Sequence, residues 1–538
     1  MSRLRVLLVS FFGFFAGSLI LVLFTGSNVP RTVWAYGEDF QEKLRIFRLI
    51  LETIQKSYVE EREAGELIEA AIHGVLEQLD PHTSYLPSDN FRRWNKNFEG
   101  FDGIGIYFDL VGERPMVTGF VQNSPAQKAG LKTGDFILKI NGKDTRGWTR
   151  SEIERALIES SAERIRLLLY NSTDKKERKV TLSKTHIYLP SIPQVHLLPN
   201  QVGYVALSRF TGTTARELDR ALDQLRSRGM KALVLDLRDN GGGYLSAAVE
   251  VADRFLPQGK LIVYTRGRMP RSFQEFRATR YHTYSDLPVV ILLNHGTASA
   301  AEIVAGALQD WDRALIVGTT SFGKGLVQSQ YRFRDGSALL VTTAKYYTPL
   351  GRCIQRDYFG MSKDEYYADA YIEHGPDQKQ QRFRTPMGRI VYGGGGIVPD
   401  IHVENSNNDV SEFVRRLYFD DGRWFYRFAL QYIKERPFVK TLPYQDLANL
   451  AITHKDLQEF ARMLEQQYEN MESSAFWSHS QDIAFLLKRE IAYLSQGEQG
   501  RFWVNFERDR QLKTACEKVN LAEKLLHMKP IAQVLHAR

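Results

Sequence analysis

A serine, a lysine and a glutamine form the most chemically informative set of residues in this sequence. Ser299 lies in the segment Gly296–Glu302 (GTASAAE), and Lys324 and Gln328 lie in the segment Phe322–Gln328 (FGKGLVQ). A serine hydroxyl becomes a nucleophile when a neighbouring base takes its proton, and a neutral lysine amine can act as that base. The set therefore predicts acyl-transfer chemistry of the serine–lysine type.

Lys324 must be neutral if it is to act as a base. The usual pKa of lysine is about 10.4, so burial has to bring it down to about 7–8. Glycines on both sides of Lys324 permit a close approach of the backbone, although an ordinary surface lysine is the alternative interpretation. In an extended segment, residues four apart share a face, so the amide of Gln328 can orient the lysine.

Ser299 opens a predicted helix over residues 299–309. The run from Ser299 to Glu302 also fits a capping box, which is the alternative interpretation. In either case the helix N-terminus supplies a positive field and free backbone N–H groups, which suit an oxyanion.

The elements that must position these residues alternate between strand and helix from about residue 186 to residue 404. Apolar runs predict strands at 202–207, 232–236, 288–293 and 314–317, and helical periodicity predicts helices at 215–225 and 245–255. Repeated strand–helix units imply a mainly parallel sheet with helices on its faces and a site at the strand ends.

Both catalytic motifs resemble those of the C-terminal processing peptidases, also called tail-specific proteases. In that family the nucleophile is the middle serine of a SASAS-like run, and the lysine lies in FGKGxVQ. Thr297 and Ala301 replace the outer serines here, while the central serine is kept. The resemblance implies that Ser299 is the nucleophile, Lys324 the general base and Gln328 the residue that positions the base.

The segment Asp236–Gly243 (DLRDNGGG) resembles the family's DLRxNxGG motif, with a plain tight turn as the alternative. Its functional interpretation is an oxyanion hole formed by the N–H groups of Gly242 and Ala300. Further resemblance occurs at residues 346–355 and 388–400, so the matching motifs extend from about residue 79 to residue 400. The resemblance implies an α/β peptidase core of the ClpP/crotonase type.

Residues 96–185 resemble a PDZ domain. Residues 124–142 read SPAQKAGLKTGDFILKING, close to the PDZ pattern SPAxxAGLxxGDxIxxING, and a loop of Gly103, Ile104, Gly105 and Ile106 precedes a strand. Such a loop presents N–H groups to the terminal carboxylate of a peptide, which adds as a strand. We expect protein or peptide partners with free, apolar C-termini. An unrelated small β domain is the alternative.

The N-terminus predicts a membrane anchor. Arg3 and Arg5 precede an uncharged run whose most apolar part, residues 6–24, is about long enough to cross a bilayer. This pattern predicts an inner-membrane protein whose catalytic part faces the periplasm. A signal peptide cleaved after Ala35, with export to the periplasm, is the alternative; a buried soluble helix is another.

Helical periodicity dominates residues 36–95 and 405–538. The first region closes with Leu79–Tyr85 (LDPHTSY), in which we interpret His82 as a turn histidine rather than a catalytic one; the family has similar segments. The second region carries no recognised motif. We interpret it as a helical packing or oligomerisation domain. The protein could therefore form a homo-oligomer or bind an adaptor protein.

Composition and near-miss motifs exclude several functions. The net charge of +8 is scattered over 538 residues without a basic stripe, which argues against a nucleic-acid partner. Cys353 and Cys516 form no CxxC motif, and their pairing is open. Residues 318–325 nearly fit a phosphate-binding loop, but Gly325 replaces the required Ser or Thr, and residues 327–334 do not predict a helix. We expect no metal and no cofactor.

These observations predict an α/β multidomain serine endopeptidase. The expected parts are an anchor (1–35), an N-terminal helical region (36–95), an inserted PDZ domain (96–185), a peptidase core (186–404) and a C-terminal helical region (405–538). We expect it to bind the C-terminal tails of exported proteins and to cleave peptide bonds through an acyl-enzyme. The alternative is a catalytically inactive PDZ adaptor or scaffold at the membrane, against which the intact set of Ser299, Lys324 and Gln328 argues.

Overall fold

The computed structural model describes residues 37–528, except 122, 161, 172–174, 280–283, 374, 376–379, 405–409, 421 and 469–472. The chain divides into two compact units, residues 1–79 and residues 80–538. The predicted anchor and the cleavage point after Ala35 lie outside the described residues.

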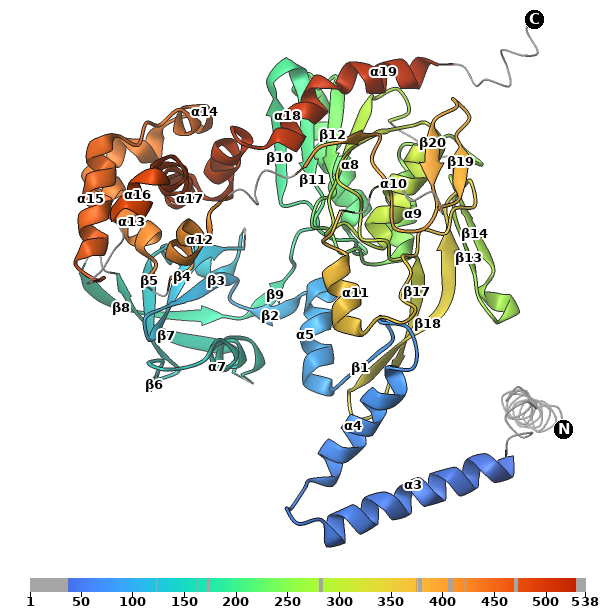
Figure 1. Ribbon diagram of the computed structural model, residues 1–538. Coiled ribbons are helices and arrows are strands. Elements are labelled where there is room, and N and C mark those ends of the chain that lie inside the picture. Colours follow the sequence, from blue (N-terminus) through green and yellow to red (C-terminus); the bar gives the residue numbers. More distant parts are fainter. Residues whose placement is uncertain are drawn as a thin grey trace, which may run out of the picture. The chain divides into compact units, whose positions relative to one another are not determined.

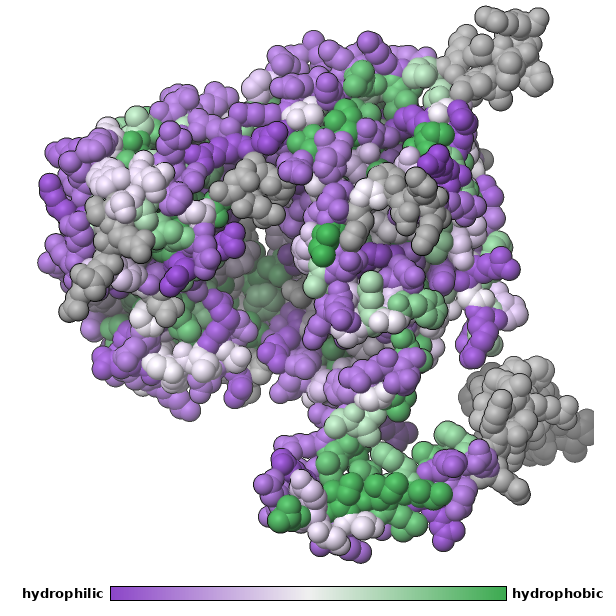
Figure 2. Space-filling view, viewed as in Figure 1, coloured by the Kyte–Doolittle hydropathy of each residue, from purple (hydrophilic) through white to green (hydrophobic). Residues whose placement is uncertain are grey.

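The described part of the first unit consists of the helices α3 (Gly37–Ser57) and α4 (Ala64–Leu76). Figure 2 shows apolar side chains gathered on these helices. Among them, Leu44, Phe47, Leu49 and Ile50 are exposed. Within the described range, no helix combines the length and the apolar character that a membrane span requires.

A six-stranded sheet forms the centre of the second unit (Figure 1). Its strands are parallel to their neighbours from β11 onward, whereas β10 pairs antiparallel with β11. In spatial order they are β10 (Gln194–Leu198), β11 (Val202–Ala206), β12 (Ala232–Asp236), β15 (Val289–Leu293), β16 (Leu315–Gly318) and β21 (Ile401–His402). The four predicted strands are all present, and the sheet has the predicted α/β character.

Helices cover both faces of this sheet. The predicted helices α8 (Thr214–Ser227), α9 (Leu245–Asp253) and α10 (Ala300–Asp310) share one hydrophobic core with the strands. The other face packs against the end of α17 (Ser480–Phe506) and against α18 (Arg510–Glu517) and α19 (Val519–His527). The C-terminal region thus completes the core around this sheet, because parallel strands need apolar cover on both faces.

A second sheet carries the lysine motif. It contains β13 (Leu261–Arg266), β14 (Gln274–Arg277), β17 (Leu326–Arg332), β18 (Ala338–Tyr347) and β1 (Ser84–Leu86). The strand β1 is an addition to the mainly helical pattern that the sequence predicts for residues 36–95. Its three residues are too few to show a period of two, and they become a strand only by pairing with β18.

The region predicted as a PDZ domain is inserted between two short paired strands, β2 (Phe101–Gly103) and β9 (Thr185–Ile187). Its sheet has the order β3 (Ile106–Val111), β4 (Arg114–Phe120), β5 (Asp135–Ile140), β7 (Arg164–Asn171) and β8 (Lys176–Ser183). The helix α5 (Ser88–Glu99) connects β1 to this region. It ends three residues beyond the expected start at residue 96.

The predicted helical character of the C-terminal region is confirmed. Together with α17, a cluster of helices builds a core of its own: α12 (Glu412–Tyr418), α13 (Trp424–Glu435), α14 (Tyr444–Ala448), α15 (His454–Glu465) and α16 (Ser473–Ser478). This cluster also contacts the inserted domain, where the Tyr493 hydroxyl donates a hydrogen bond to the carbonyl of Thr118 at 2.7 Å. Cys353 and Cys516 are unpaired.

Candidate active site

Ser299 lies at the junction between strand β15 and helix α10, as the sequence predicts. It is half-buried, and its backbone has φ 56° and ψ −116°. A positive φ is uncommon for a residue with a side chain, and it persists only when the surroundings hold it in place. The chain therefore makes a sharp, constrained turn at the expected nucleophile.

Lys324 and Gln328 are in direct contact. The Lys324 Nζ donates to the Gln328 Oε1 at 2.9 Å, and a β-bulge at Val327 and Gln328 interrupts the pairing of β17 with β18. Burial lowers the pKa of the Lys324 ammonium, and the charges of Asp80 and Glu302 oppose this shift without reversing it. Burial thus shifts the equilibrium towards the neutral amine, the form that a general base requires.

Glu302 links the two motifs, a role that the sequence did not reveal. Its fully buried carboxylate accepts hydrogen bonds from the N–H groups of Ser299 (2.7 Å), Gly323 (2.7 Å) and Lys324 (2.9 Å) and from the hydroxyl of Ser321 (2.5 Å). Burial raises the pKa of Glu302 to about 7, although these hydrogen bonds favour the charged form. Its contact with Ser299 is one half of the predicted capping box, and that pattern was the only signal for Glu302.

Tyr346 provides a second link between the motifs. Its buried hydroxyl lies 2.6 Å from the carbonyl oxygen of Lys324 and 3.1 Å from that of Ser299. Because both contacts are to the main chain, they fix the path of the backbone on each side of the site.

The glycine segment approaches Ser299 closely. A Cβ atom on Gly242, which has φ +98°, would lie 2.8 Å from the Ser299 Cβ and 3.0 Å from the Ala300 N, so only glycine fits there. Gly242 and Ala300 are thus neighbours, as predicted. However, the N–H of Gly242 donates to the Asn240 Oδ1 at 2.9 Å and is occupied in this arrangement. Among the described residues, the N–H of Ala300 has no hydrogen-bond acceptor.

The three predicted catalytic residues line one cavity of about 370 Å³. Gly241 and Gly243 line it as well, and most of its remaining wall is apolar. Trp94 and Phe98 of α5 contribute to this wall together with Tyr244; the ring centroids lie 4.8 Å apart for Trp94 and Phe98 and 5.6 Å apart for Phe98 and Tyr244. Sequence reasoning missed these aromatic residues because nothing local connects α5 with the site.

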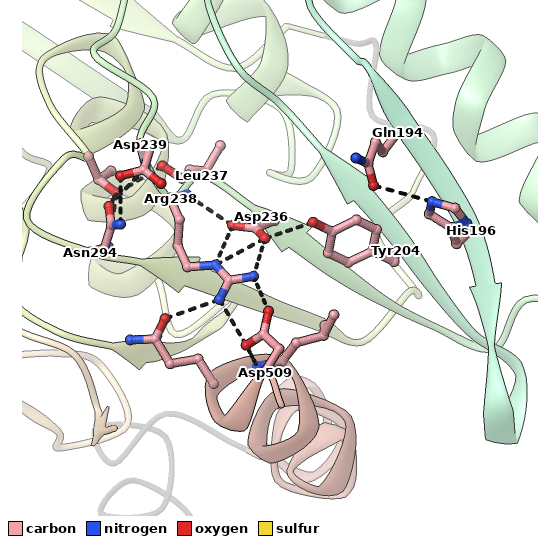
Figure 3. Close-up of polar contacts among 12 residues, drawn as sticks. Gln194, His196, Tyr204, Asp236, Leu237, Arg238, Asp239, Asn294 and Asp509 are labelled. Atoms are coloured by element: carbon pink, nitrogen blue, oxygen red, sulfur yellow. Dashed lines mark hydrogen bonds and ion pairs between the residues drawn. The ribbon is translucent and has the colours of Figure 1, made fainter. Parts of the chain in front are cut away.

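An ionic network anchors the segment Asp236–Gly243 to the C-terminal region (Figure 3). The Arg238 guanidinium donates to both oxygens of Asp509 at 2.9 and 2.8 Å, while its Nε lies 3.0 Å from the Asp236 Oδ1. Tyr204 donates to the Asp236 carboxylate at 2.8 Å. Burial lowers the pKa of Arg238, but the two carboxylates outweigh this effect and raise it well above its usual value.

The same segment is tied to the chain that leads to Ser299. The backbone N–H of Asp239 donates to the Asn294 Oδ1, and the Asn294 Nδ2 donates to the Asp239 Oδ1, both at 2.8 Å. The N–H of Ala298 donates to the carbonyl of Asn240 at 2.9 Å. These contacts hold the glycines next to the nucleophile.

The predicted peptide-binding loop leads into an edge strand. Gly103 ends β2, and Ile106 begins β3, which pairs with β4 alone among the described strands. The free edge of β3 can accept an added strand. The Ile104 side chain is only 2% exposed and packs in the domain core, so it offers almost no surface to a ligand, and only its backbone is available.

Comparisons with known proteins found two matching family models and several similar proteases. The model of peptidase family S41 matches residues 201–366, and a PDZ domain model matches residues 116–171. A carboxy-terminal-processing protease of Bartonella bacilliformis is 37% identical over 323 residues, which cover 59% of this chain and 74% of that protein.

A probable CtpA-like serine protease of Staphylococcus aureus is 31% identical over 317 residues. The match covers 58% of this chain and 63% of that protein, so the chain spans just under two thirds of this relative. Among solved structures, a photosystem II D1 C-terminal processing protease aligns with 67% of this chain and 92% of its own, at 24% identity and a TM-score of 0.34.

Proposed function

Because this chain belongs to peptidase family S41, among the carboxy-terminal-processing proteases, we propose that it is a serine endopeptidase that cuts proteins selected by their C-terminal tails. The family and the PDZ domain support a peptide substrate. The roles of individual residues rest on the geometry described above.

In the proposed reaction, the Ser299 Oγ attacks the scissile carbonyl carbon while the neutral Lys324 amine takes the hydroxyl proton. The C–N bond then breaks, and the leaving amine takes that proton from the Lys324 ammonium. Water attacks the resulting ester while Lys324 takes a proton from it; the ester C–O bond then breaks, and the Ser299 Oγ takes that proton from the Lys324 ammonium, which regenerates the serine and the neutral amine. The lowered pKa of Lys324 supports this assignment.

The oxyanion of each tetrahedral intermediate needs two N–H donors. The N–H of Ala300, at the first position of α10, is one candidate. Gly242 can be the second only if its N–H leaves the Asn240 Oδ1. Gly241 and Gly243 already line the cavity, so a small rotation of this glycine segment would decide which N–H faces the substrate.

For the substrate, we propose an extended tail added to the free edge of β3, with its carboxylate at the loop of Gly103 to Ile106. The apolar wall of the active-site cavity supports apolar side chains beside the cleaved bond. The N-terminal arginines and the uncharged run that follows support an inner-membrane location facing the periplasm, or export to the periplasm. A homo-oligomer or an adaptor partner is compatible with the exposed apolar residues of α3.

The observation that carries the proposal is the hydrogen bond between Lys324 and Gln328 inside the cavity that Ser299 also lines. The test is to incubate the full chain with candidate periplasmic proteins and to identify new C-termini by mass spectrometry. The wild-type chain should generate them, and Ser299→Ala should not. If both bind tailed proteins and neither cleaves them, the inactive adaptor is the correct function.

A further inference from the structure

The amide of Gln328 has two partners on opposite sides. Its Oε1 accepts from the Lys324 Nζ at 2.9 Å, and its Nε2 donates to the main-chain carbonyl of His82 at 2.5 Å. If the amide were rotated by 180°, its NH₂ group would face the Lys324 side chain. A charged lysine can only donate hydrogen bonds, so two donors would then face each other. The carbonyl of His82 therefore determines that the amide presents oxygen to Lys324.

Asp80 holds this carbonyl in place by shaping the turn around it. The Asp80 Oδ1 accepts from the N–H groups of His82 and Thr83, both at 3.0 Å, and its Oδ2 accepts from the Thr83 hydroxyl at 2.6 Å. The Thr83 Oγ1 in turn accepts from the N–H of Thr342 in β18 at 3.2 Å. Burial raises the pKa of Asp80, but the hydrogen bonds from Thr83 and from the N–H of His82 outweigh it and keep the carboxylate charged.

The imidazole of His82 fastens the turn to α11 (Lys363–Asp369). Its Nδ1 lies 3.1 Å from the Tyr367 hydroxyl and its Nε2 lies 3.2 Å from the Tyr366 hydroxyl. Burial and the nearby Lys324 charge lower the pKa of this ring to about 3, so it stays neutral. Both ring nitrogens are thus engaged by tyrosine hydroxyls.

A second path runs from the same ring back to the lysine motif. Tyr366, beside the His82 ring, accepts from the Gln355 Nε2 at 3.1 Å, and the Gln355 Oε1 accepts from the N–H of Gly325 at 2.8 Å. This path starts at the His82 ring, whereas Asp80 and Thr83 hold the main chain whose carbonyl faces Gln328.

We propose that the turn of Asp80, His82 and Thr83 is a positioning element of the catalytic site: the His82 carbonyl orients Gln328, which in turn holds Lys324. The inference rests on the proposed role of Lys324 as the general base. It also gives the LDPHTSY segment a part in the reaction, although none of its side chains is proposed to touch the substrate.

The experiment compares Asp80→Asn and Thr83→Val with a matched control, Asp335→Asn, in the full chain. Asp335 shapes an equivalent turn between β17 and β18, where its Oδ1 accepts from the N–H of Ser337 at 2.9 Å and from its hydroxyl at 2.7 Å. We expect each turn variant to lower kcat about tenfold with KM changed less than twofold, and the control to match the wild type.

Two further measurements distinguish a positioning role of the turn from a general loss of structure. Asp80→Asn removes a negative charge near Lys324 and also releases the amide oxygen that faces it. Both changes disfavour the ammonium form of Lys324, so the rising limb of the plot of kcat against pH should move to lower pH. The double variants Asp80→Asn/Gln328→Ala and Thr83→Val/Gln328→Ala should be no slower than Gln328→Ala alone, because the turn acts through that amide.

Wild-type turnover in both turn variants would overturn the inference. So would a double variant whose loss in kcat equals the product of the losses in the two single variants. If Asp80→Asn fails to fold, the cycle with Thr83→Val decides alone. Substantial activity in Lys324→Ala would instead remove the general base, which is a failure of the proposed function rather than of this inference.

Discussion

Ser299 and Lys324 share one hydrogen-bond acceptor, the Oε2 atom of Glu302. This oxygen lies 2.7 Å from the backbone nitrogen of Ser299 and 2.9 Å from that of Lys324. Two motifs that are separate in the sequence are thereby held to a common point inside the protein. The arrangement fixes main-chain positions and leaves the serine hydroxyl and the lysine amine for chemistry.

Removing either member of the dyad should abolish cleavage. Ser299→Ala and Lys324→Ala should each reduce kcat/KM to the background rate while the melting temperature stays near that of the wild type. The double variant should be scarcely worse than either single one, because the two residues act as a unit. Retention of a tenth or more of wild-type turnover by Lys324→Ala would contradict the assignment.

Activity should rise with pH through the deprotonation of Lys324. Because burial lowers the pKa of this ammonium, the midpoint of the rise in kcat/KM should lie below the usual lysine value of about 10.4. The measurement is kcat/KM between pH 5 and pH 10, with circular dichroism at each pH to confirm folding. A rate independent of pH over this range would exclude a lysine base.

Glu302→Gln should destabilise the fold and slow peptide cleavage. The amide has one acceptor oxygen where the carboxylate has two, and its NH₂ group would face backbone donors. Leaving buried donors unsatisfied costs about 1–3 kcal/mol, which urea denaturation would measure as a loss in the free energy of unfolding. Glu275→Gln, at an exposed salt bridge, is the control and should change stability by less than about 0.5 kcal/mol.

Phe98→Ala should weaken the selection of apolar side chains at the cleaved bond. We expect kcat/KM to fall about tenfold for peptides with leucine or phenylalanine at that position and less than threefold for peptides with alanine, since the aromatic wall contacts only the larger groups. Phe359→Ala is the control, because Phe359 is 83% exposed. Equal losses for all peptides would mean that Phe98 has a structural role only.

Tail binding should depend on a free carboxylate and on Gly105. Amidation of a substrate's C-terminus removes the charge that the loop N–H groups would bind and should weaken binding to the Ser299→Ala chain about tenfold. Gly105→Ala should have a similar effect, because a Cβ there would overlap Ser124, whereas Gly112→Ala carries similar backbone strain in open space and should bind normally. Fluorescence anisotropy would measure both, and equal affinities for acid and amide would refute recognition of C-termini.

Much of the core was predictable because each element carries its own local pattern. The all-buried strand β12 occupies the predicted residues 232–236, and α10 begins beside Ser299 as expected. The contact between Lys324 and Gln328 was expected, although Lys324 precedes β17 and a β-bulge lies between the two residues, so plain strand alternation is not its cause. In each case a short stretch of sequence contains the information that determines the structure.

The features that could not be predicted depend on contacts between residues that are far apart in the sequence. Glu302 looks like a local cap, and its contact with Lys324 arises only after folding. The three residues of β1 need β18 to become a strand. Trp94 and Phe98 reach the cavity because α5 is placed there by the elements on either side. The occupied N–H of Gly242 reflects a rotation of one peptide, which a motif does not encode.

The helices α18 and α19, which close the second face of the central sheet, come from the end of the described chain. Asp509, at the start of α18, also binds the arginine that precedes the glycine segment. During synthesis the sheet therefore keeps one uncovered apolar face until residues 502–522 have emerged. We expect the nascent chain to remain without proteolytic activity through that period, so that cleavage begins only after α18 and α19 have been made and have packed against the sheet.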